Sequence, residues 1–140
     1  MSSIHFFSRE IDFVLSKKTI LRSWIIRVVA NENRSISELN FIFCTDQYLV
    51  KLNRDYLSRD YFTDVITFDQ SEADKLQGEV YISIPRVKEN AGKYQNTFSN
   101  ELSRVMIHGV LHLLGYRAGS DKEKQLMRKK EEASLSLLPS

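Results

Sequence analysis

Two of the three histidines in the sequence, His108 and His112, stand four residues apart in its most apolar segment. Apolar residues recur at helical spacing through this segment, so it predicts one helix that carries both histidines. Gly115 follows the last of these apolar residues, as is typical of a helix C-terminus. At this spacing the two side chains lie on one face of the helix, with their Cβ atoms about 5–6 Å apart. Two imidazoles held in this way can bind one transition-metal ion.

A second interpretation is a plain structural domain in which both histidines are core residues hydrogen-bonded to the backbone.

The residue that follows His108 limits the reaction that such a metal site could catalyse. Zinc proteases use the motif His-Glu-x-x-His, in which the glutamate is the general base. Gly109 occupies that position here, so hydrolysis of peptides by that route is not expected.

The composition indicates a soluble globular protein. The chain has 140 residues, of which 42% are hydrophobic and 27% charged, with a formal net charge of +2. We therefore predict a single domain over residues 1–140. Cys44 is the sole cysteine, so no intramolecular disulfide can form, and a reducing cytoplasmic location is expected. The first ten residues do not have the pattern of a signal peptide, and no apolar run reaches the roughly 18 residues of a membrane span.

Hydrophobic periodicity predicts an α+β fold. The expected strands and helices alternate along the first half of the chain and end in three helices; the strands are residues 4–7, 39–44, 65–68 and 79–84, and the helices 16–31, 46–56, 85–94, 99–114 and 120–134. The last two strands should be antiparallel because their connection is short, whereas the earlier connections suit parallel crossovers. The predicted fold is thus a small four-stranded mixed sheet with about five helices. Residues 128–132 are mixed in charge and are expected on a solvated helix face.

Four segments in order resemble the YbeY family, bacterial ribosomal-RNA maturation factors described as metal-dependent endoribonucleases. They are Leu52-Asn53-x-x-Tyr56, Asp60-x-x-Thr63-Asp64-Val65-Ile66-Thr67-Phe68, Gly78-Glu79-Val80-x-Ile82-Ser83 and His108-Gly109-x-Leu111-His112-Leu113-x-Gly115-Tyr116.

The resemblance implies a compact, zincin-like fold and a hydrolase that cuts single-stranded RNA. Its expected role is maturation of the 3′ end of 16S ribosomal RNA, with ribosomal RNA and the small ribosomal subunit as partners and neither DNA nor a membrane. By the same resemblance, His108 and His112 bind one zinc ion and are catalytic.

The sequence departs from the family pattern at two positions. The family motif ends in a third metal-binding histidine, where this chain has Ala118. Asp121 is a candidate replacement, although its place at the start of a predicted helix favours a capping role. A carboxylate in place of the histidine keeps zinc possible and also admits nickel or manganese. An arginine thought to serve catalysis is replaced by Leu57, and Arg59 is the nearby candidate for its role. Both departures leave open an alternative: a ribosome-associated RNA-binding factor with weak or lost hydrolytic activity.

Overall fold

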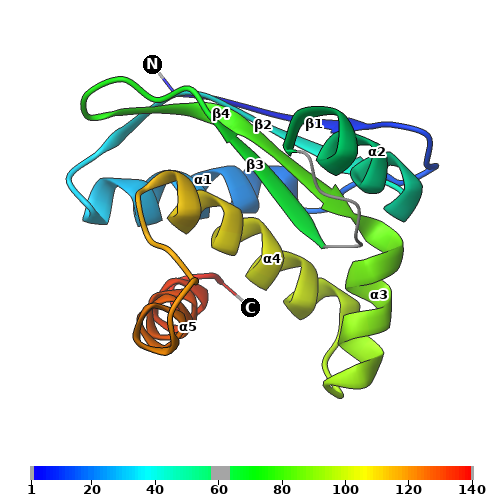
Figure 1. Ribbon diagram of the computed structural model, residues 1–140. Helices are drawn as coiled ribbons and strands as arrows, with labels where there is room; N and C mark the ends of the chain where they lie inside the picture. The colour runs from blue at the N-terminus through cyan, green and yellow to red at the C-terminus, as the bar shows by residue number, and fades with distance from the viewer. Residues whose placement is uncertain (1, 58–63, 140) are drawn as a thin grey trace.

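The computed structural model describes residues 2–57 and 64–139, which form five helices and one four-stranded sheet (Figure 1). The strands are β1 (Ser3–Ser8), β2 (Ser35–Cys44), β3 (Val65–Asp69) and β4 (Lys75–Ser83). The helices are α1 (Lys18–Asn31), α2 (Asp46–Leu57), α3 (Ile84–Lys93), α4 (Phe98–Leu113) and α5 (Asp121–Leu135). None of these described helices is long and apolar enough to cross a lipid bilayer. The predicted α+β class, with its mixed four-stranded sheet and five helices, is confirmed.

The strands lie in the order β1-β2-β4-β3. Strands β1, β2 and β4 are parallel, and β3 runs antiparallel to β4 at one edge of the sheet. The predicted antiparallel pair and the predicted parallel crossovers are therefore both confirmed. The register of the antiparallel pair sets Thr67 of β3 opposite Val80 of β4, a pairing that matters for the site described below.

The helices form layers on the sheet. Helices α1 and α4 cover one face, and α5 lies beneath α4 on the side away from the sheet (Figure 1). Successive side chains of a strand point to opposite faces. On β4, Val80 and Ile82 thus belong to the main core, whereas Tyr81 packs in a smaller cluster around Leu49 of α2. Helix α4 is consequently packed against the sheet on one side and against α5 on the other.

Helix α4 comes very close to the sheet at Gly109. A Cβ atom added to this glycine would lie 2.6 Å from Cγ1 of Val80, far inside van der Waals contact. Helix α4 can approach β4 this closely only because residue 109 has no side chain. A glutamate at this position, as in the zinc proteases, has no room in this packing.

The connection between α4 and α5 is fixed by the local structure at both of its ends. Gly115 has a φ of +111°, a backbone conformation that favours glycine, and it ends α4 as predicted. The predicted capping box of α5 is also present, because Ser120 Oγ accepts from the Glu123 backbone N–H and the Glu123 carboxylate accepts from the Ser120 N–H. Between them, the Tyr116 hydroxyl donates to Oε1 of Glu32 at 2.7 Å, which ties this connection to the end of α1.

Because Gly109 sets the distance between α4 and β4, Gly109→Ala should destabilise the fold. Overpacking of this kind costs about 1–3 kcal/mol. The matched control is Gly92→Ala in α3, where the added methyl group would meet no atom within 4 Å. Urea unfolding of both variants tests this, and a Gly109→Ala variant as stable as the wild type would contradict the close packing.

Candidate metal centre

His108 and His112 lie on one face of α4, as predicted, and each ring contacts a different neighbouring element. Nδ1 of His112 is 2.9 Å from the hydroxyl Oγ1 of Thr67 on β3. Nδ1 of His108 is 2.6 Å from Oε2 of Glu131 on α5. Each ring is therefore held through Nδ1, which leaves both Nε2 atoms for another partner.

Glu131 connects His108 to a buried charge network. Glu131 is only 6% exposed, and its Oε1 accepts a hydrogen bond from Nη1 of Arg104 at 3.2 Å. The Arg104 guanidinium also donates to both carboxylate oxygens of Glu101, at 3.1 and 2.6 Å. Glu101 is itself only 1% exposed. Two carboxylates thus share one guanidinium beneath His108.

This network keeps Glu131 ionised. Burial raises the pKa of its carboxyl group, but the hydrogen bond from His108 and the charges of His108 and Arg104 oppose this and leave the pKa below its usual value. An ionised carboxylate only accepts hydrogen bonds, so Nδ1 of His108 must carry the proton. When this ring is neutral, its lone pair is on Nε2, the atom that would face a metal ion.

The surroundings of His112 favour its neutral form. Burial lowers the pKa of this imidazole, and the positive charges of Arg117 and His108 lower it further, against a smaller opposing effect of Asp69. Arg117 lies close by, since its Nη1 donates to the backbone carbonyl of His112 at 3.2 Å. The neutral imidazole is the form that binds metal ions.

The hydrogen-bonding pattern of the two histidines therefore matches that of metal-binding histidines. Metal-binding histidines commonly use one ring nitrogen for the metal and donate the other N–H to a carboxylate or another oxygen. The described residues contain no group of three His, Cys, Asp or Glu side chains placed to hold a metal ion. Ala118 lies beside His108 but offers no ligand atom. Asp121 is exposed in the first turn of α5, in keeping with the capping role that its sequence context favours.

One further prediction concerns the arginine that the family has where this chain has Leu57. Leu57 is the last residue of α2, and Arg59 lies outside the residues that the structure describes. The role of Arg59 therefore stays a prediction.

The prediction that residues 128–132 form a solvated face is wrong for Glu131, although Arg128, Lys129 and Glu132 are exposed. The reason is that α5 packs on α4 through the buried residues Met127, Glu131 and Ser134. Their spacing of four and then three residues is that of one helical stripe, and this was the signal available in the sequence. Neither Glu131 nor Thr67 stands out as a site residue by type or local spacing, because their partners lie 23 and 45 residues away.

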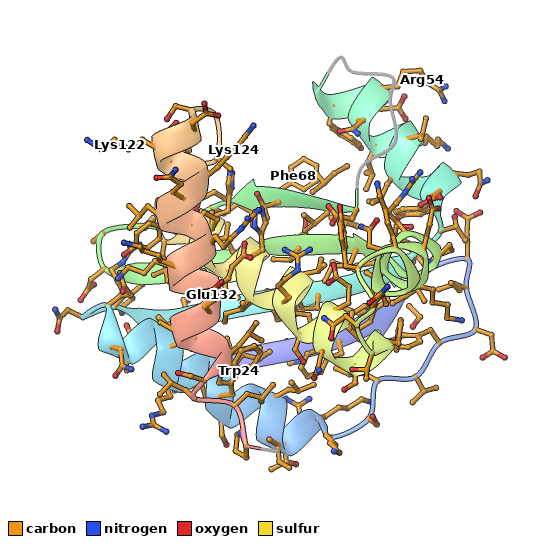
Figure 2. All side chains as sticks on the ribbon, turned by 90° about the horizontal axis from the view of Figure 1, so that it is seen from below. Trp24, Arg54, Phe68, Lys122, Lys124 and Glu132 are labelled. Carbon is orange, nitrogen blue, oxygen red and sulfur yellow. The ribbon has the colours of Figure 1, made fainter. Side chains whose placement is uncertain are left out.

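We expect Glu131 to act as a positioning residue for His108. Glu131→Gln keeps the shape of the side chain but removes the charge that fixes the Nδ1 proton, so zinc affinity should fall. Loss of such a partner typically lowers metal affinity about 10–100-fold. The neighbouring Glu132→Gln, on an exposed residue of the same helix (labelled in Figure 2), makes the same charge change and should leave the affinity unaltered.

Zinc affinity is measured by competition with a chromophoric chelator, beside urea unfolding to confirm that both variants are folded. Equal zinc affinities of two folded variants would remove Glu131 from the site.

The comparisons with known proteins agree with the resemblance. The family model described as endoribonuclease YbeY matches residues 6–138. Relatives named endoribonuclease YbeY include one from Cytophaga hutchinsonii, 48% identical over 96% of this chain and 95% of that protein, and one from Flavobacterium psychrophilum, 49% identical over 94% of each. The solution structure of TM1509 from Thermotoga maritima matches with a TM-score of 0.68 and 29% identity, over 96% of this chain and 88% of that one. The chain therefore belongs to the endoribonuclease YbeY family.

Proposed function

We propose that this chain is a cytoplasmic endoribonuclease that cuts single-stranded RNA with one zinc ion held by His108 and His112. We propose further that its substrate is the 3′ end of 16S ribosomal RNA in the small ribosomal subunit. The observation that carries the proposal is the pair of histidines with both Nδ1 atoms engaged, by Glu131 and by Thr67, while neither Nε2 atom has a hydrogen-bond partner among residues 2–57 and 64–139. Membership of a family whose relatives are named endoribonucleases supports the choice of RNA as the substrate.

The residues around the histidines have separate tasks in this proposal. A bound zinc ion supplies a Lewis acid and lowers the pKa of a water molecule toward neutrality. His108 and His112 would hold the ion through their Nε2 atoms, and Glu131 and Thr67 fix the orientation of the two rings. Arg117 is an exposed guanidinium beside His112, where it can stabilise negative charge on an RNA phosphate.

Arg59 remains the proposed second guanidinium for the scissile phosphate. Gly109 leaves no carboxylate at the position of the protease base, which favours RNA over peptide bonds as the substrate.

One observation favours a second function. No third protein ligand is present among the described residues, and a two-histidine site binds metal less tightly than a three-ligand site. The alternative is therefore an RNA-binding factor of the ribosome with weak or no hydrolysis.

The first test concerns the metal. Zinc added to the protein should shift the ring signals of both His108 and His112 in nuclear magnetic resonance spectra, because both rings bind the same ion. Elemental analysis of tag-free protein should find zinc, and the His112→Ala variant should lose it. His5→Ala is the matched control, since His5 is exposed on β1 at the opposite edge of the sheet. Ring signals unchanged at excess zinc would rule out the site.

The second test concerns the reaction. The wild type and the His5→Ala variant should degrade an unstructured RNA. The His108→Ala substitution or a chelator should abolish this degradation. Casein should stay intact throughout. Cleavage of casein that disappears in His108→Ala would overturn the proposal, and RNA loss that resists both the chelator and His108→Ala would assign the activity to a contaminant. Binding of RNA without cleavage would favour the alternative function.

A further inference from the structure

A cavity of about 180 Å³ opens between α4 and the first half of α5, directly beside His108. It is lined by Arg104, His108, Ala118, Lys124, Met127, Arg128 and Glu131. Since one water molecule takes up about 30 Å³, the cavity has room for a group several times larger than water. Ala118 contributes only a methyl group to this wall, so the position where the family has a histidine is here part of an open pocket.

The charges of the lining residues are unequal in number. Arg104, Lys124 and Arg128 are cationic, whereas Glu131 is the one carboxylate in the wall. Glu131 and Arg104 already satisfy one another, and the second carboxylate that pairs with Arg104 is Glu101. Lys124 and Arg128 form no ion pair with any residue in the described ranges 2–57 and 64–139. The pocket therefore presents two unpaired cations next to His108.

These two cations are four residues apart on α5, where side chains lie one turn apart on the same face. Like charges at this spacing repel and destabilise an isolated helix. An anion between them would relieve that repulsion. Figure 2 shows Lys124 and Lys122 on opposite sides of α5.

We propose that this pocket binds a backbone phosphate of single-stranded RNA, with Lys124 and Arg128 as its cationic ligands. The inference rests on the proposed function, because it takes the RNA bound at His108 and His112 as the source of the phosphate. A phosphodiester carries one negative charge and acceptor oxygens, which match a lysine ammonium and an arginine guanidinium. The RNA strand would then continue from the histidines along the first turns of α5.

The test measures binding of a short, fluorescently labelled oligouridylate by anisotropy, in the presence of chelator so that no cleavage occurs. The double variant Lys124→Ala/Arg128→Ala should bind about tenfold or more weakly than the wild type at low salt, because both cationic ligands of the phosphate are lost. Its plot of log affinity against log salt should be shallower by about 0.7, the value for one phosphate of a single strand.

The matched control is Lys122→Ala/Lys129→Ala. Both of these lysines are exposed on α5 and line a different hollow, so the variant makes the same change in net charge away from His108. It should keep nearly the affinity and salt dependence of the wild type. The exchange Lys124→Arg/Arg128→Lys, which keeps both charges, should retain most of the binding.

Equal weakening by the two alanine pairs would show a non-specific effect of charge and overturn the pocket, as would a wild-type protein that binds no oligouridylate. The outcome is separate from that of the proposed cleavage. A protein that never cuts RNA but binds it through Lys124 and Arg128 would support the phosphate site and contradict the nuclease function. If the wild type cuts RNA but the substitutions at Lys124 and Arg128 weaken binding no more than the control does, the nuclease function is supported and the phosphate site is contradicted.

Discussion

The close contact between Gly109 and Val80 determines how the candidate site is built. Val80 lies opposite Thr67 in the antiparallel ladder of β3 and β4, so the residue on which α4 rests is the neighbour of the residue that holds His112. With α4 at this height, the His112 ring reaches the edge strand of the sheet. His108, one turn earlier, lies where α5 crosses α4 and meets Glu131 instead. A longer side chain at position 109 would lift the helix away from the strand and lengthen the contact between Thr67 and His112.

The buried charges beside His108 also require an explanation, because burial of an ion is costly unless it is paired. Glu101 and Glu131 are both buried and share the guanidinium of Arg104. Two carboxylates and one guanidinium leave an excess of negative charge when the imidazole is neutral. This excess lies on the side of Glu131 that contacts His108, so it favours a cation at the other nitrogen of the ring. A protonated His108 would offset the same excess as an ion pair with Glu131, so the buried charges are compatible with both a metal centre and a structural role of this histidine.

Local sequence patterns were sufficient for most of the fold. The alternation of the strands, the helical spacing around His108 and His112, and the Ser120 capping box all depend on residues that are close in the chain. The short connection between β3 and β4 was enough to predict their antiparallel pairing. Sheet order was not predictable in this way, since it depends on how segments far apart in sequence pack together.

The partners of the histidines were missed for the same reason. Glu131 lies in a run of mixed charges that is typical of a solvated helix, and only its contacts with His108 and Arg104 explain its burial. In the sequence, Thr67 is an ordinary strand residue. Only the register of β3 against β4 places it beside His112 of α4. A site formed by contacts across 23 and 45 residues of sequence has no local signature beyond the two histidines themselves.

The absence of a ligand at Ala118 changes what the remaining residues must do. A metal ion bound by two protein atoms gains less binding energy than one bound by three. The entropic cost of ordering the two rings is then a larger fraction of the binding free energy. In the proposed metal site, Thr67 and Glu131 would reduce that cost, because rings already held in place lose little freedom on binding. The space left by the missing side chain is not filled by another carboxylate or histidine of the described residues but opens toward Lys124 and Arg128. An RNA phosphate bound at these cations would lie beside His108, next to the place where a metal ion would bind.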